Sequence, residues 1–280
     1  TTSADSPPTG VGRLLTSYRE RTYVCTQYLH KFGQAARGAD AVAIVPGFAS
    51  LYRTDVLDRI DIDAPGLSIE DFNMTFEVHA KRLGRIAFHP ECAVAETQDP
   101  AVLRDYSAQV RRWSLGFWQT VRRHGPHPGL FWSSVGVFAI ETVVSSLVLV
   151  AMLPLLVVGA LAALVAATTD GAAAATAAGV AAALPVLPLA AGFLIVDFVM
   201  SAFTCAVSRT RPHPRMLVFP LLRVWDATLC LRALVAALGR PSDGRWRSPD
   251  RRMSQPSVEP AAAPLSSPLR EGGPRAVPAR

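Results

Sequence analysis

The chain has 280 residues, of which 50% are hydrophobic and 18% charged, and its formal net charge is +6 at pH 7. An average soluble chain carries roughly 25% charged residues, so this composition excludes a disordered or collagen-like protein and argues against a wholly soluble one. The four cysteines stand far apart and form no Cys-x-x-Cys pair, which disfavours a disulfide scaffold and a zinc ribbon.

The first predicted region, residues 1–126, carries mixed charge and few long apolar runs, as is typical of a soluble α/β segment. Within it, Glu70 and Asp71 follow Ser68 and precede a helical pattern of apolar residues that begins at Phe72. Carboxylates are favoured in the first turn of a helix, so helix-start chemistry is one explanation of the pair. The other is a general base held at a helix N-terminus and aimed at a cleft. Spacing alone leaves both interpretations open.

An amphipathic helix is predicted next, from Ala101 to Val121, because apolar residues recur there every three or four positions. Gln109, Arg112 and Trp113 share one face of this helix. A guanidinium can bind a diphosphate with two hydrogen bonds, an amide can add another, and an indole offers a platform for a sugar ring. The alternative is an ordinary basic helix that lies on an anionic membrane surface.

The second predicted region, residues 127–239, is a membrane region. A helix needs about 20 apolar residues to cross the core of a bilayer, and residues 131–165 and 180–207 both satisfy this length. A Thr-Thr-Asp-Gly turn and an alanine-rich tract separate them. The third apolar stretch, residues 216–238, contains charged side chains, so we interpret it as an interfacial helix, with a third span as the alternative.

Charge patterning extends this prediction to the third stretch and to the tail. Arg223 and Asp226 lie three residues apart, and we expect them to pair on one helix face. Arginines cluster on both sides of the stretch, and positive loops stay in the cytoplasm. We therefore expect a multi-pass protein of the inner or plasma membrane, and we attribute the arginines to topology, not to nucleic-acid binding. Residues 240–280 are predicted as a largely disordered cytoplasmic tail.

Two motifs together carry a family resemblance. Glu70-Asp71, followed along the chain by Gln109-x-x-Arg112-Trp113 and then by apolar spans, resembles the membrane-embedded family 2 glycosyltransferases. The closest in look are the processive bacterial poly-N-acetylglucosamine, cellulose and hyaluronan synthases. The resemblance implies the C-terminal half of a GT-A type α/β domain that ends in an amphipathic interfacial helix, followed by transmembrane and interfacial α-helices.

Shorter stretches extend the resemblance over about residues 10–252. The family motif usually reads Thr-Glu-Asp, and here Ile69 occupies the threonine position while both carboxylates are kept. The segment around Gly47 is similar to the glycine-containing loop that precedes the catalytic aspartate. The segment with Trp246 and Arg251 resembles the tail of the poly-N-acetylglucosamine synthases, where both residues are expected near the nucleotide.

The resemblance implies a role for each residue of the two main motifs. Asp71 is expected to be the general base that deprotonates the acceptor hydroxyl, and Glu70 is expected to support it. Gln109 and Arg112 are expected to bind the diphosphate of the donor, and Trp113 to stack against the acceptor sugar. The implied reaction moves a hexosyl unit from a UDP-sugar to a growing polysaccharide with inversion, coupled to translocation across the membrane.

A divalent cation, Mg²⁺ or Mn²⁺, is expected on the donor diphosphate. The family binds it through an Asp-x-Asp motif upstream of the catalytic aspartate. Asp61-Ile62-Asp63 has that spacing but lies too close to Asp71, so we interpret it as an acidic pair at a loop edge. The resemblance thus places most metal ligands outside this chain. Whether the nucleotide half belongs to the same polypeptide or to a separate one stays open.

The expected partners are a UDP-sugar, a glycan acceptor, the lipid bilayer and an accessory subunit. Glu141 and Asp197 lie inside the predicted spans, and we expect one of them to line a path for the glycan. Two other functions compete with the synthase: a non-processive transferase that acts on a lipid-linked acceptor, and a non-catalytic membrane fragment or partner protein. The motifs do not identify the sugar or the linkage.

Overall fold

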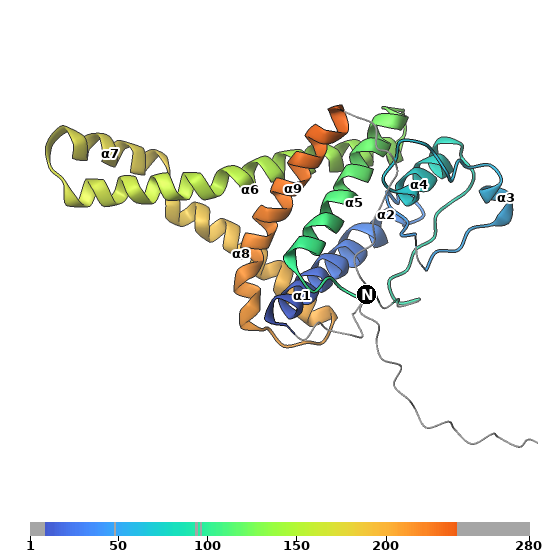
Figure 1. Ribbon diagram of the computed structural model, residues 1–280, viewed down its shortest axis with the longest axis horizontal. Helices are drawn as coiled ribbons and strands as arrows, with labels where there is room; N and C mark the ends of the chain where they lie inside the picture. The colour runs from blue at the N-terminus through green and yellow to red at the C-terminus, as the bar shows by residue number, and fades with distance from the viewer. Residues whose placement is uncertain (1–8, 48, 93–94, 96, 240–280) are drawn as a thin grey trace, which may run out of the picture. The chain divides into compact units, whose positions relative to one another are not determined.

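The computed structural model describes residues 9–239, apart from residues 48, 93–94 and 96. The predicted tail, with Trp246 and Arg251, lies outside the described residues. In chain order the elements are α1 (Gly10–Cys25), the π-helix η1 (Thr26–Lys31), α2 (Phe32–Gln34), α3 (Thr54–Leu57), α4 (Glu70–Ala80), α5 (Leu103–His124), α6 (Leu130–Thr168), α7 (Gly171–Ala183), α8 (Val186–Val207), the 3₁₀-helix η2 (Pro214–Val218) and α9 (Phe219–Gly239) (Figure 1).

The expectation of an α/β fold is wrong for the residues that the structure describes, because they contain helices and no β-strand. Residues 41–45 have the apolar character of a strand and are largely buried. Their backbone groups bond to side chains and, at Ala41, to the carbonyl of Gln34, and not to a neighbouring strand. The amide of Val45 donates to Oγ1 of Thr75 (3.1 Å), and the amide of Ala43 donates to Oε1 of Gln34 (3.4 Å). Side-chain acceptors thus satisfy donors that a sheet ladder would otherwise use.

The predicted amphipathic helix is confirmed as α5, which begins two residues later than expected and ends at His124. α9 runs beside α5 and packs against α6 (Figure 1). The ring of Phe117 in α5 also meets that of Phe138 in α6 edge to face. A buried cluster fills the space between these helices and the beginning of α4. Its members are Ile69, Phe72, Phe117, Trp118, Ala233 and Ala237. The apolar face of α5 therefore joins the acidic pair at the start of α4 to the helices that follow.

Two segments are long and apolar enough to cross a membrane, Leu130–Thr168 and Gly171–Val207. The alanine-rich tract, which we expected to separate the two spans, forms α7, because alanine is the best helix former. Leu184 and Pro185 separate α7 from α8, since the residue before a proline disfavours helical geometry.

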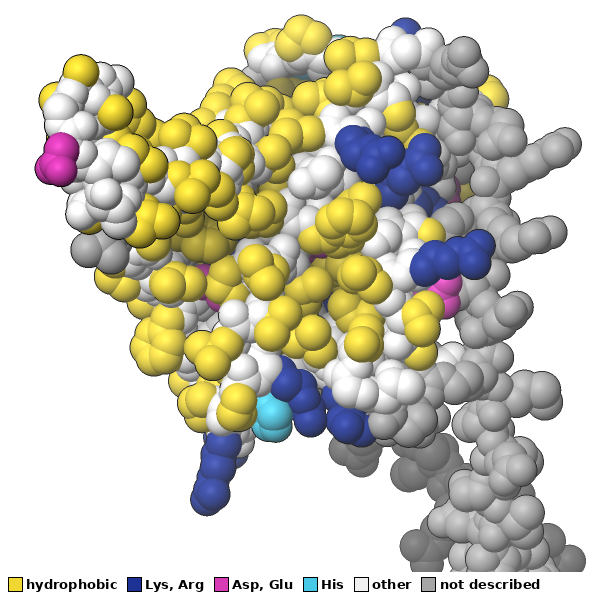
Figure 2. Space-filling model, turned by 60° about the vertical axis from the view of Figure 1, so that its left-hand side comes forward, with side chains coloured by type: hydrophobic (Ala, Val, Ile, Leu, Met, Phe, Trp, Pro, Cys, Tyr) yellow, Lys and Arg dark blue, Asp and Glu magenta, His cyan; other side chains and the backbone are white. Residues whose placement is uncertain are grey.

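The surface of these helices is apolar. Val137, Ile140, Leu161, Ile195 and Phe198 are each more than half exposed. In Figure 2 hydrophobic side chains cover most of the visible face, and dark-blue basic side chains lie toward the right and at the lower edge. Monomeric soluble proteins rarely expose apolar patches of this kind.

Buried charged groups connect α1 with α8 and α9. Nη1 of Arg21 lies 2.8 Å from Oδ2 of Asp197, and Nη1 of Arg223 lies 3.2 Å from Oδ1 of the same carboxylate. Asp197 is only 3% exposed. Its carboxylate is therefore occupied by two cations, an arrangement that leaves little capacity for a passing glycan. Glu141, by contrast, is exposed.

Asp226 has other partners than the one that the sequence predicted. The hydroxyl of Tyr18 in α1 donates to its carboxylate (2.9 Å), and the hydroxyl of Tyr106 in α5 does the same (2.8 Å). The expected pair between Arg223 and Asp226 is wrong, because Arg223 binds Asp197 instead. Arg223 and Asp226 thus serve contacts between helices and not a contact within one helix.

Candidate functional site

Hydrogen bonds join the loop that contains Gly47, the glycine loop, to the beginning of α4. The amide of Gly47 donates a hydrogen bond of 2.9 Å to Oδ2 of Asp71. Thr75 makes a second link, because its hydroxyl donates to the carbonyl of Asp71 (2.8 Å) and accepts from the amide of Val45. A side chain at position 47 would touch both carboxylates, since its Cβ would lie 3.4 Å from Asp71 and 3.7 Å from Glu70. The sequence analysis selected Gly47 and Asp71 but missed Thr75.

Helix α5 fixes the same acidic pair from the other side. The amide of Ser68 donates to Oε1 of Gln119, a buried residue of α5 (2.9 Å). Gly116 allows the two elements to approach, because a Cβ there would lie only 2.9 Å from the side chain of Ile69. Ile69 immediately precedes the pair. The close helix contact therefore sets where Glu70 and Asp71 lie, and neither Gln119 nor Gly116 belongs to a motif that the sequence analysis used.

Asp71 keeps one oxygen available. Its Oδ2 is bound by Gly47, whereas its Oδ1 is buried and makes no hydrogen bond to the described residues. Burial raises the pKa of the Asp71 carboxyl and the charge of Glu70 adds to the rise, while the Gly47 N–H and the charge of Arg112 oppose it. A positioned carboxylate with a free oxygen and a raised pKa has the properties of a general base. The structure also brings Arg112 within electrostatic reach of Asp71.

Two further side chains surround Asp71 that the sequence analysis did not select. Burial lowers the pKa of Lys31 to about 8, and the charge of Asp71 opposes this shift. Burial raises the pKa of Tyr52, and the charge of Asp71 adds to the rise. Lys31 ends the π-helical segment η1, a rare conformation that is frequent at functional sites. A π-helix has no clear sequence signal, which explains why Lys31 was missed.

Arg19 of α1 occupies the centre of the face that carries the second motif. Its Nη1 donates to Oε1 of Gln109, and its Nε forms a buried ion pair of 2.7 Å with Asp99. Because an arginine can only donate, the oxygen of Gln109 faces Arg19. The amide nitrogen of Gln109 makes no hydrogen bond to the described part of the chain, so it remains a potential donor.

Trp113 is half-buried beside the same arginine. The guanidinium carbon of Arg19 lies 5.1 Å from the centre of its ring, and Tyr23 meets it edge-on at 6.4 Å. A cation over an indole is worth about 0.5–1 kcal/mol at an exposed site and more when it is desolvated. The orientation of Trp113 is thus fixed before any ligand binds.

The described residues do not fit a divalent cation. No group of three or more His, Cys, Asp or Glu side chains comes together among them. Asp61 of the Asp-x-Asp pattern forms an ion pair of 3.0 Å with Arg123 of α5. Oδ1 of Asp71, which makes no hydrogen bond to the described residues, is not joined by the further ligands that such an ion requires.

The comparisons with known proteins give one match. A family model described as "Glycosyl transferase family group 2" matches residues 7–208. This range contains the glycine loop, the acidic pair at the start of α4 and the whole of α5. Neither a curated protein nor a solved structure matches the chain significantly.

Proposed function

Because the chain belongs to glycosyl transferase family group 2, we propose that Asp71 is the general base of a transferase that moves a hexosyl unit from a UDP-sugar to a growing polysaccharide with inversion. The observation that carries this proposal is the buried Oδ1 of Asp71, which makes no hydrogen bond to the described residues while Oδ2 is held by Gly47. The family implies a sugar donor and a sugar acceptor. The class of sugar and the polymeric product belong to the proposal.

The proposed reaction is a displacement at the anomeric carbon of the donor. The acceptor hydroxyl attacks this carbon, its proton passes to Oδ1 of Asp71, and the bond to the UDP oxygen breaks with its electron pair on UDP. Inversion follows, because the acceptor attacks opposite the leaving group. The N–H of Gly47 holds the carboxylate in place, and burial, with the charge of Glu70 adding to it, raises the pKa of Asp71.

The leaving diphosphate is assigned to the face of α5. Arg112 and the amide nitrogen of Gln109 are its proposed donors, and they neutralise the charge that develops as the bond breaks. Arg19 fixes the oxygen of Gln109 so that the amide nitrogen points elsewhere. Trp113, held by Arg19 and Tyr23, is the proposed platform for the acceptor sugar. Trp246 and Arg251 remain proposed nucleotide contacts outside the described residues.

A divalent cation is general in this family and would stabilise charge on the departing diphosphate. The described residues do not fit such an ion. We therefore assign its ligands to residues beyond those described and derive no step through it.

The membrane is the proposed setting of the reaction. The apolar surfaces of α6, α7 and α8 support their insertion into the inner or plasma membrane, with residues 1–126 and the 240–280 tail in the cytoplasm. Within the proposed membrane region of residues 127–239, the candidate spans are Leu130–Thr168 and Gly171–Val207, and α9, together with α5, is assigned to the membrane interface. Transfer coupled to translocation, and an accessory subunit, are part of this proposal. A non-processive transferase would share Asp71 but yield a product with a single added sugar.

Asp71→Asn tests the proposal. We expect the rate of UDP release, measured in membranes that contain the variant as the only copy, to fall roughly 10²- to 10⁴-fold. Asn keeps the size of the side chain and can still accept from Gly47, so the protein should fold. The matched control is Asp63→Asn, an exposed carboxylate of the preceding loop, which should retain wild-type activity. Activity of Asp71→Asn within a factor of three of the control would rule out the general-base role.

A further inference from the structure

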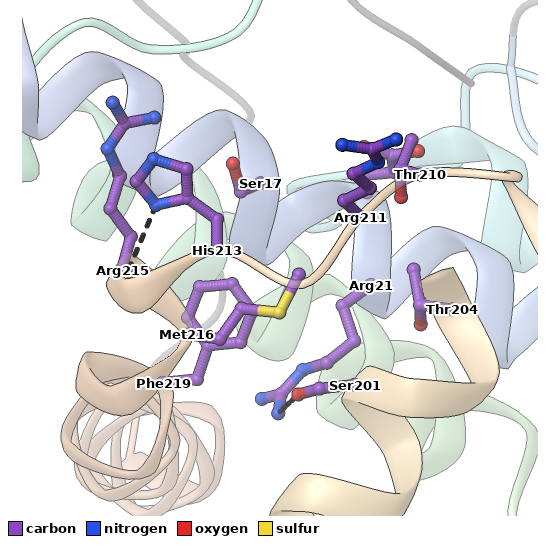
Figure 3. A pocket seen from close by; sticks show the side chains of 11 residues that line it. Ser17, Arg21, Ser201, Thr204, Thr210, Arg211, His213, Arg215, Met216 and Phe219 are labelled. Atoms are coloured by element: carbon purple, nitrogen blue, oxygen red, sulfur yellow. Dashed lines mark hydrogen bonds between the residues drawn. The ribbon is translucent and has the colours of Figure 1, made fainter. Parts of the chain in front are cut away.

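A polar cavity lies between α1, α8 and the segment that leads from α8 into η2 (Figure 3). Its volume is about 150 Å³. Pockets for whole cofactors or drug-sized ligands occupy roughly 300–1,000 Å³, so this cavity suits one small polar group. Basic side chains come from both sides: Arg21 from α1, and Arg211, His213 and Arg215 from the connecting segment.

The cavity offers several donors that the fold does not use. Nη1 of Arg21 is held by Asp197 and by Oγ of Ser201 (3.2 Å), while its other N–H groups make no hydrogen bond to the residues that the structure describes. Among those residues, neither Arg211 nor Arg215 has a carboxylate within ion-pair distance. Both of their guanidinium groups are therefore available to a ligand.

His213 is oriented as a further donor. Its Nδ1 accepts the backbone N–H of Arg215 at 3.1 Å, which Figure 3 marks with a dashed line. In a neutral ring the proton then resides on Nε2. Guanidinium groups and an imidazole N–H are the donors that recognise phosphate oxygens.

The charge of the lining limits the ligand. Glu20 also lines the cavity and opposes an anion. Arg21 shares the single charge of Asp197 with Arg223. Together with Arg211 and Arg215, these arginines exceed the carboxylates of Asp197 and Glu20 by two positive charges. This positive excess accommodates an anionic phosphate group, and a phosphodiester is the form that a lipid headgroup presents. Met216 and Phe219 supply an apolar wall for the carbon atoms next to such a group.

We propose that this cavity binds the phosphodiester of an anionic lipid headgroup, with Arg21, Arg211 and Arg215 as donors. The apolar surface of α8 ends where the cavity begins, so a lipid chain could lie along the helix while its headgroup enters. Basic pockets at the ends of membrane helices bind anionic headgroups in this way. The choice of a lipid rests on the membrane placement proposed above, whereas phosphate binding itself does not.

Native mass spectrometry of the detergent-purified chain, titrated with short-chain phosphatidylglycerol, tests the site. The test variant is Arg211→Gln/Arg215→Gln, and the charge-matched control is Arg209→Gln/Arg104→Gln, which removes two exposed arginines outside the cavity. We expect affinity to fall about tenfold or more in the test variant, because two charge-assisted contacts are lost, and to change less than twofold in the control. Ser17→Glu, which adds a negative charge to the cavity lining, should weaken binding independently, and circular dichroism verifies that each variant is folded.

The other titrations decide the source of the phosphate. Phosphatidylcholine should bind much more weakly, since its headgroup carries a compensating positive charge. If inorganic phosphate binds instead of phosphatidylglycerol, and the test variant alone loses it, the phosphate site is supported but the lipid is ruled out. Equal phosphatidylglycerol binding by the test and control variants would overturn the site. So would an absence of binding by both ligands. None of these outcomes depends on transferase activity, so they are independent of the Asp71→Asn result.

Discussion

The carboxylate of Asp71 is half-buried and that of Asp197 is buried. The two differ in how many of their oxygens have a partner. Asp197 is paired through both oxygens, one with Arg21 and the other with Arg223. Asp71 is bound through Oδ2 alone, and its Oδ1 makes no hydrogen bond to the described residues. The difference teaches that a satisfied buried carboxylate holds helices together, whereas an incompletely satisfied one is available for chemistry. Five predictions test this distinction and the contacts around the two carboxylates.

The largest effect on stability is expected from Asp197→Asn. The substitution leaves Arg21 and Arg223 buried without a compensating charge, and breaking a buried ion pair costs about 3–5 kcal/mol. The free energy of unfolding in detergent, measured by denaturant titration, should fall by this amount. Asp170→Asn, at an exposed carboxylate of the turn before α7, should change it by less than about 0.5 kcal/mol.

Asp71→Asn should behave in the opposite way. Burial raises the pKa of this carboxyl, so the folded state binds its proton more tightly than the unfolded state. The charged form thus opposes folding at neutral pH, and this contribution becomes more favourable as the pH falls through the raised pKa. The melting temperature of Asp71→Asn at pH 7 should therefore equal or exceed that of the wild type. A loss as large as that of Asp197→Asn would erase the distinction between the two carboxylates.

Gly116→Ala should produce an intermediate effect. The new methyl group would lie 2.9 Å from Ile69, so α5 and the beginning of α4 must move apart. Overpacking of this kind costs about 1–3 kcal/mol, and the shift should also reduce activity because Ile69 adjoins Glu70. Gly136→Ala is the control, since nothing lies within 4 Å of a Cβ at that helical position. A stabilised and fully active Gly116→Ala would show that the close contact does not position the site.

A smaller effect is expected from Tyr106→Phe. The variant loses one hydrogen bond to Asp226 but keeps that of Tyr18, so the free energy of unfolding should fall by about 1–2 kcal/mol. Tyr28→Phe, for which the structure shows no hydrogen bond among the described residues, serves as the reference. Equal stability of the two variants would indicate that Asp226 is satisfied without Tyr106.

The smallest effect is a shift in a pH profile. Lys31 is charged below its pKa of about 8, and its positive charge then favours the charged form of Asp71. Lys31→Gln removes this charge, which should raise the pKa of Asp71 and move the acidic limb of the activity profile to higher pH. Above pH 8 the wild-type lysine is itself neutral, so the two profiles should converge. Lys81→Gln, on the far end of α4, should leave the profile unchanged, and an identical profile for Lys31→Gln would separate Lys31 from the site.

The sequence was a good guide where one element carries its own pattern. The apolar periodicity of residues 101–121 predicted α5, and the length of the apolar run from residue 131 predicted α6. It failed where the outcome depends on distant partners. Residues 41–45 look like a strand but satisfy their backbone with Gln34 and Thr75, and no local pattern reveals this.

The candidate site shows the same limit. Asp71, Gly47 and Arg112 could be selected because their residue types and spacing form recognisable motifs. Arg19 and Arg21 could not, since arginines are usually exposed and nothing in α1 marks these two as buried. The pairing of Arg223 with Asp226 was wrong for a related reason, because a rule for neighbours on one helix ignores acceptors and donors on α1, α5 and α8.

The position of Arg19 has a consequence for how this surface can evolve. The guanidinium of Arg19 bonds to Gln109, pairs with Asp99 and lies over the ring of Trp113. A substitution at any of these positions therefore disturbs the contacts of the others. A lineage that replaces Asp99 leaves a buried cation behind and must alter residue 19 as well. Residues 19, 99 and 109 should therefore vary as a set among related sequences, although they are separated by up to 90 positions. Such covariation would identify the arginine in α1 as an inherited part of the motif on α5.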